Sequence, residues 1–147
     1  MIFSRLRRRT FLVASLGPAA TALGQRRPKQ ADLKSIAIDT EKLPWEQILE
    51  ERVHRTFSLK RLVRDSDTGM EISMVRYPAG FVLPLHTHPC AHGIYVLTGV
   101  LVTNEGRFAP GSFVWFPEGL RMEHGATAEQ DVTVLFVTNK PFGIQYV

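Results

Sequence analysis

The sequence of 147 residues contains one cysteine, Cys90, so no disulfide can form within the chain. It has no apolar run long enough for a transmembrane helix, and beyond residue 24 it has no basic block. Four of the 18 Lys and Arg residues lie in residues 1–24, which contain no acid, and the other 14 are balanced by 14 Asp and Glu. A neutral body attracts phosphate weakly, so we expect no nucleic-acid partner.

Residues 1–24 have the composition of an export signal. The stretch Arg8-Arg9-Thr10-Phe11-Leu12 closely resembles a twin-arginine signal, and the mildly apolar run that it opens ends in small residues at Ala22. Cleavage after Ala22 or Gly24 would leave no stable membrane anchor. The alternative interpretation of residues 1–24 is a basic tail or an uncleaved membrane anchor. The composition predicts the twin-arginine export machinery as a partner, and a periplasmic or secreted protein exported in the folded state.

The rest of the chain predicts an all-β domain. Residues 25–52 are polar and indicate a lead-in segment, with a short helix after Pro44 or an irregular approach as alternatives. Residues 53–147 contain short β-branched and aromatic runs separated by turn signals about every eight to twelve residues, without a helical period. Thr98-Gly99 marks a tight turn between two of these runs. The pattern is typical of a β-sandwich or barrel.

Four of the five histidines lie in two short segments bounded by turn residues. His86 and His88 are two residues apart, so in a strand both imidazoles point to one face. His92 begins the next apolar run, and His124 follows a loop expected to return across the barrel mouth. Because neutral imidazole suits Fe, Mn, Zn, Cu and Ni, the pattern predicts a metal site. His54 stands alone and is interpreted as structural or exposed.

Two motifs in this region resemble those of the cupin family. The first is Gly80-x5-His86-x-His88-x3-His92-x6-Gly99, and the second is Gly111-x5-Pro117-x-Gly119-x4-His124. The resemblance covers about residues 70–138 and implies a single antiparallel jelly-roll barrel with a metal held inside. The sequence departs from the family pattern in two places: His92 replaces a glutamate, and two extra residues precede His124.

The histidine at position 92 makes the site similar to the all-histidine cupins, such as the acetylacetone-cleaving dioxygenase group. This resemblance implies His86, His88 and His124 as ligands, with His92 as a fourth ligand or a substrate hydrogen-bonder. Fe(II) is the favoured divalent transition metal, with Mn, Zn, Ni or Cu as alternatives. Neutral ligands leave the charge of the ion uncompensated, which favours an anionic substrate or an enolate.

Several functions remain open at the level of sequence. The first is a non-haem metal oxygenase or dioxygenase acting on a small enolisable or phenolic substrate, with Glu123 as the candidate base. The second is a non-catalytic periplasmic cupin that binds a metal or a small ligand, and a Lewis-acid isomerase or lyase is a third. Glu118 is an alternative to Glu123, either as the base or as a hydrogen-bond acceptor for an imidazole N–H. Cys90 is interpreted as a small side chain that fills space in the core. Pairing of edge strands into a homodimer is an open alternative.

The aromatic residues near the motifs are expected to pack in the core. Tyr77, Tyr95, Trp115 and Phe116, together with Arg76, are also candidates to line a pocket, because strand periodicity does not tell which of them face inward.

Overall fold

The computed structural model describes residues 34–147, and every regular element in that range is a β-strand. The predicted export signal lies outside the described residues. Eleven strands follow one another along the chain: β1 (Glu46–Glu50), β2 (Arg55–Arg64), β3 (Glu71–Tyr77), β4 (Val82–Thr87), β5 (His92–Thr98), β6 (Leu101–Thr103), β7 (Gly106–Phe108), β8 (Phe113–Phe116), β9 (Met122–Ala126), β10 (Val132–Thr138) and β11 (Gln145–Tyr146). Within this range, no helix is long and apolar enough to cross a membrane.

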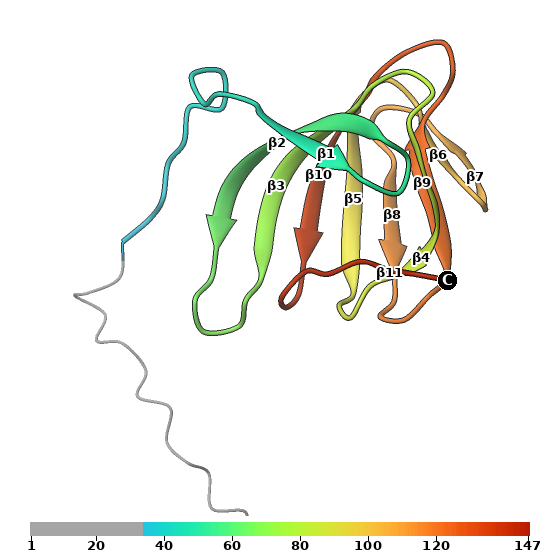
Figure 1. Ribbon diagram of the computed structural model, residues 1–147. Coiled ribbons are helices and arrows are strands. Elements are labelled where there is room, and N and C mark those ends of the chain that lie inside the picture. Colours follow the sequence, from blue (N-terminus) through green and yellow to red (C-terminus); the bar gives the residue numbers. More distant parts are fainter. Residues whose placement is uncertain (1–33) are drawn as a thin grey trace, which may run out of the picture. The chain divides into compact units, whose positions relative to one another are not determined.

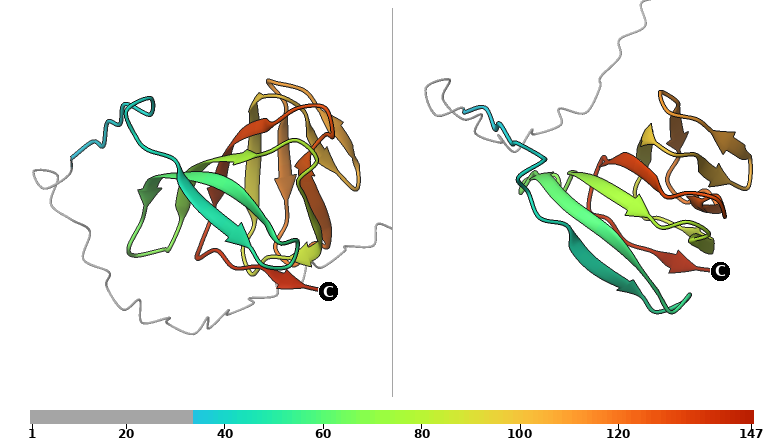
Figure 2. Two further views of the ribbon diagram at one scale, coloured as in Figure 1. Left: turned by 45° about the horizontal axis from the view of Figure 1, so that its top comes forward. Right: turned by 90° about the horizontal axis from the view of Figure 1, so that it is seen from above.

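The strands form two antiparallel sheets that enclose an interior (Figures 1 and 2). One sheet has the order β1-β2-β3-β10-β5-β8, and the other has the order β11-β4-β9-β6-β7. Successive strands β3, β4 and β5 alternate between the two sheets, so residues distant in sequence meet across the interior. The predicted all-β architecture is confirmed, and so is the turn at Gly99, which has a φ of 74° between β5 and β6.

The core forms where strand alternation directs apolar side chains between the sheets. On β3, Ser73, Val75 and Tyr77 are buried, while Met74 and Arg76 between them are more exposed. Phe81 is fully buried and stacks on Tyr77 with ring centroids 5.2 Å apart. Burying one such side chain completely stabilises the fold by about 1.5–3 kcal/mol. The core therefore fixes the strands that carry the histidines.

A close approach between strands β4 and β9 depends on a glycine. A Cβ atom on Gly125 would overlap the carbonyl oxygen of Phe81 and crowd Val82. The same carbonyl accepts a hydrogen bond from the backbone N–H of Ala126 at 2.7 Å. Gly125 thus permits the contact that places its neighbour, His124, opposite Leu83 of β4.

The described domain begins earlier than residue 53. Strand β1 lies inside the stretch 25–52 that the sequence assigned to a lead-in, and it pairs with β2 through Ile48 and Phe57. The helix considered after Pro44 is wrong, because these residues form an edge strand instead. Ile48 and Glu50 fall on one face of β1, and both line the interior cavity described below.

Candidate metal centre

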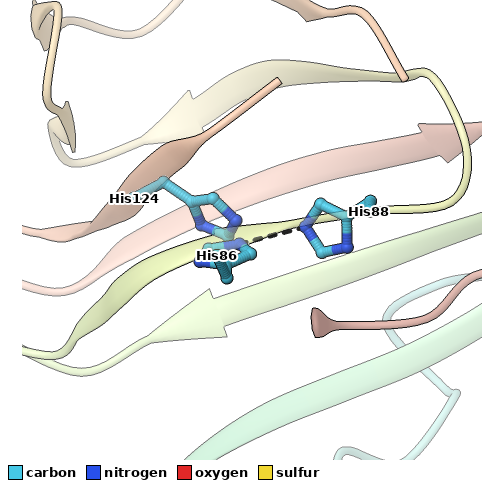
Figure 3. Close-up of side chains that lie close together, drawn as sticks. All are labelled: His86, His88 and His124. Atoms are coloured by element: carbon cyan, nitrogen blue, oxygen red, sulfur yellow. Dashed lines mark hydrogen bonds between the residues drawn. The ribbon is translucent and has the colours of Figure 1, made fainter. Parts of the chain in front are cut away.

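Three of the predicted histidines converge inside the domain. His86 lies on β4, His88 follows two residues later, and His124 lies on β9, whose Met122 pairs with His86 (Figure 3). One ring nitrogen from each histidine can be chosen such that all three lie within 4.8 Å of one another. The shared face of His86 and His88 is confirmed. His124 follows the segment 117–121, which forms no strand, and lies within β9.

Backbone carbonyls orient two of these rings. Nδ1–H of His86 donates to the carbonyl oxygen of Pro84 at 2.7 Å, and Nδ1–H of His88 donates to that of Gly143. A carbonyl oxygen only accepts hydrogen bonds, so in each neutral ring the proton sits on Nδ1 and Nε2 carries a lone pair. Hydrogen bonds of this kind, made by the ring nitrogen that does not face the metal, fix the tautomer of metal-binding histidines.

The two free Nε2 atoms face each other at 3.0 Å. Two lone pairs at this separation repel unless a cation lies between them. With metal–nitrogen bonds of about 2.1 Å, ligands at right angles around an ion lie about 3.0 Å apart. The spacing therefore fits two imidazoles bound to one transition ion.

Burial keeps the histidines in the neutral form that binds metal. His86, His88, His92 and His124 are each 1% exposed or less. Desolvation lowers the pKa of His88 from 6.5 to about 4 and that of His92 to about 3, and it also lowers the pKa values of His86 and His124. Hence no proton competes strongly with a metal ion at neutral pH.

His92 lies beside the cluster rather than within it. Its ring is sandwiched between Phe116 and Phe136, with centroids 4.9 and 4.8 Å away, and lies 4.7 Å from the ring of His88. The carbonyl of Cys90 is nearby, but the ring nitrogens of His92, like those of His124, have no partner in hydrogen-bond geometry. Buried polar atoms without partners cost free energy, which fits a site built to take a ligand. Coordination by His92 stays a prediction.

A cavity of about 240 Å³ reaches His124 from the side of the large sheet. Its wall is mostly apolar, with a few polar side chains on β1, β2, β3 and β10. It is lined by Ile48, Glu50, Phe57, Leu59, Arg61, Glu71, Ser73, Val75, Tyr77, Leu83, His124, Phe136, Thr138, Phe142 and Ile144. One histidine of the cluster is thus directly accessible to a small molecule held in an apolar space.

The two acids near the second motif lie away from this cavity. Glu123 is half-buried on β9 between Met122 and His124, so strand alternation directs its side chain to the opposite face. Neither it nor Glu118, which is exposed and pairs with Lys140 at 2.7 Å, lines the cavity. A base role for Glu123 stays a prediction that this geometry does not favour.

The other residues singled out from the sequence divide between interior and surface. Tyr77 lines the cavity and Phe116 packs on His92. Tyr95 and Trp115 are 41% and 51% exposed, so the expected core packing is wrong for these two. Cys90 is fully buried, and burial raises the pKa of its thiol, which keeps the thiol protonated and unreactive.

Several residues at the site have no local sequence signal. Phe142 packs 4.7 Å from the ring of His88, and the carbonyl of Gly143 accepts the hydrogen bond from that histidine. Tyr146, on β11, lies 5.9 Å from the ring of His86. Glu50 enters the cavity from β1. All four come from segments outside the two motifs and reach the site only through tertiary pairing.

Comparisons with known proteins agree with this architecture. The model of the ChrR cupin-like domain family matches residues 33–143. Among curated proteins, none matches the chain significantly. Similar solved structures include a protein of unknown function with a cupin-like fold from Ralstonia eutropha, at 20% identity and a TM-score of 0.65, covering 76% of this chain and 77% of that chain.

Two further solved structures share the fold. A candidate acetylacetone dioxygenase from Methylibium petroleiphilum has 12% identity and a TM-score of 0.66, over 82% of this chain and 85% of that chain. A chain in the complex of Rhodobacter sphaeroides SigE with the anti-sigma ChrR has 19% identity and a TM-score of 0.55, over 67% of this chain and 50% of that chain. At these identities the likeness establishes the fold alone.

Proposed function

Because the chain belongs to the ChrR cupin-like domain family, we propose that it is a metal-dependent cupin whose His86, His88 and His124 hold one divalent transition ion. The observation that carries this proposal is the 3.0 Å approach of two Nε2 atoms whose Nδ1 protons are both engaged elsewhere. Fe(II) is favoured, with Mn, Zn, Ni or Cu as alternatives. His92 is proposed as a fourth ligand or as a hydrogen-bond partner for substrate.

We further propose a non-haem oxygenase or dioxygenase activity on a small enolisable or phenolic substrate. The cavity of about 240 Å³ is smaller than ordinary ligand pockets, which span about 300–1,000 Å³, so it selects small molecules. A bound Fe(II) would supply the activation of dioxygen. The apolar wall excludes water, and Leu83, Phe136 and Phe142 hold the substrate against the histidines.

A non-catalytic binding module is the second candidate function. It is favoured by the fourth buried imidazole, since His92 lies 4.7 Å from the ring of His88. Four nitrogen ligands would close the coordination shell, and a closed shell is typical of structural rather than catalytic sites.

Metal content and dioxygen uptake distinguish these functions. Protein purified without oxygen is expected to bind about one equivalent of divalent metal, and with Fe(II) it is expected to consume dioxygen when a 1,3-diketone or a catechol is added. Protein that binds no metal contradicts both candidates. Metal binding without dioxygen uptake, together with four nitrogen ligands and no exchangeable water in X-ray absorption, would leave the binding module.

We also propose export to the periplasm or beyond by the twin-arginine machinery, on the strength of the sequence Arg8-Arg9-Thr10-Phe11-Leu12. Replacing Arg8 and Arg9 with lysine is expected to abolish export and to retain the precursor in the cytoplasm. Cell fractionation and immunoblotting measure this directly. Unchanged export of the double variant would contradict the proposed route.

A further inference from the structure

We propose that Glu50 is the proton acceptor for a substrate bound beside the histidine cluster. This inference rests on the proposed function and names the substrate class: a neutral, mainly apolar molecule that carries an acidic C–H next to a carbonyl, or a phenolic O–H. Glu50 lies on the edge strand β1, outside both histidine motifs, and lines the same cavity as His124.

The carboxylate of Glu50 is held in place but is not neutralised. The backbone N–H of Arg52 donates to Oε1 of Glu50 at 3.1 Å. No ion pair involves Glu50 within residues 34–147, whereas the other charged residues of the cavity are paired, Arg61 with Glu46 and Glu71 with Arg64. The Tyr146 hydroxyl lies beside this carboxylate but outside hydrogen-bond geometry, so Oε2 can accept a proton from a bound molecule.

Two tyrosines lie beside the histidine cluster and near Glu50. The ring of Tyr77 lies 5.6 Å from that of His124, and the ring of Tyr146 lies 5.9 Å from that of His86. Burial, and after it the close approach of its hydroxyl to the Glu50 carboxylate, raises the pKa of Tyr146; burial also raises the pKa of Tyr77, with smaller contributions from Tyr146 and Glu50. Both hydroxyls stay protonated, and that of Tyr146 is buried without a partner in hydrogen-bond geometry. Glu50 is thus the anionic group among neutral donors.

The pairing of the charged residues around the cavity also restricts the charge of the substrate. Arg61, the arginine that lines the cavity, is committed to Glu46, and Arg55, which lies outside the cavity wall, donates through Nη1 and Nη2 to the carbonyls of Gly80 and Ala79. The cavity therefore lacks an uncommitted cation for a substrate carboxylate, among the residues that the structure describes. A neutral molecule that becomes anionic only after losing a proton fits this environment.

The step itself is a proton transfer. The acidic C–H or O–H bond of the substrate breaks, its proton forms an O–H bond with Oε2 of Glu50, and the electron pair stays on the substrate as an enolate or phenolate. No oxidant takes part in this step. The three neutral imidazoles would hold a divalent ion whose uncompensated charge would favour the resulting anion electrostatically.

The test uses acetylacetone and Zn(II)-loaded protein under nitrogen in D2O, where proton NMR follows deuterium exchange at the central carbon. Wild-type protein is expected to accelerate exchange over Zn(II) alone, and Glu50→Gln is expected to slow the protein-dependent exchange by about 100-fold or more. The matched control is Glu51→Gln, which removes the same charge from the adjacent exposed residue and is expected to exchange like wild type.

A second measurement does not depend on turnover. The ultraviolet spectrum of acetylacetone bound to the protein is expected to show the enolate with wild type and the protonated form with Glu50→Gln. Equal exchange rates in the two proteins, or no acceleration by metal-loaded wild type, would overturn the role of Glu50 while leaving the metal site intact. Failure of wild-type protein to bind Zn(II) would instead contradict the proposed function, and the retained metal content and melting temperature of Glu50→Gln show that it folds.

Discussion

Replacing His124 with alanine is expected to lower the affinity for the divalent ion by more than about 100-fold. Loss of a residue that merely orients a ligand costs about 10–100-fold, and His124 is itself one of three converging imidazoles, so its loss costs more. The variant should also lose the stabilisation that bound metal gives to the folded protein. For the wild type this amounts to about 4 kcal/mol when the free metal concentration is 1,000 times the dissociation constant. Competition with a chromophoric chelator and thermal unfolding with added metal measure the two effects.

His54→Ala is the control for this experiment. His54 is exposed in the turn between β1 and β2 and lies outside the histidine cluster, so its removal is expected to leave metal affinity unchanged. Wild-type affinity in His124→Ala would show that the ion binds elsewhere. A comparable loss in both variants would point to non-specific binding through surface imidazoles.

The metal-free protein is expected to lose about 4 kcal/mol of stability between pH 7 and pH 5. An unfolded histidine takes up a proton below about pH 6.5, whereas burial holds the pKa of folded His88 at about 4 and that of His92 at about 3. The unfolded state therefore binds more protons in this window, so stability falls as the pH falls. Each of the two residues contributes about 2 kcal/mol, and His86 and His124 act in the same direction.

Urea unfolding at half-unit steps of pH measures this slope after removal of metal at neutral pH. The variant His92→Phe should show a shallower slope, because the phenyl ring does not titrate and can occupy the same stack between Phe116 and Phe136. Bound metal should shift the loss to lower pH, since it holds the imidazoles in the neutral form. Constant stability from pH 7 to pH 5 would contradict the buried, neutral state of these histidines.

The interior placement of His86 and His88 followed from sequence because strand periodicity is a local property. Two residues apart in a strand means one shared face, and both histidines are buried. The burial of Leu83, three positions before His86, reflects an irregularity in the β4–β9 register between these two residues, which the sequence pattern does not reveal. The turn at Gly99 could be predicted from sequence for a similar reason, because the turn requires a residue with positive φ and glycine adopts it without strain.

The carboxylate near the site could not be predicted from local sequence in the same way. Glu123 is adjacent to a ligand in sequence, but adjacent residues on a strand face opposite sides of the sheet. Glu50 belongs to the polar stretch 25–52 that the sequence assigns to a lead-in, and it lines the cavity because β1 pairs with β2. Tyr95 and Trp115 likewise share the composition of core residues, yet their register places them on the outer face.

The hydrogen bond from His88 to the carbonyl of Gly143 spans 55 positions of the chain. Contacts between such distant segments form late in folding, because the loop entropy must be overcome first. The ligand geometry is therefore complete only when the segments that carry His88 and Gly143 have come together. It follows that the ion is a ligand of the native state alone, and that a rising metal concentration draws unfolded chains into that state by mass action.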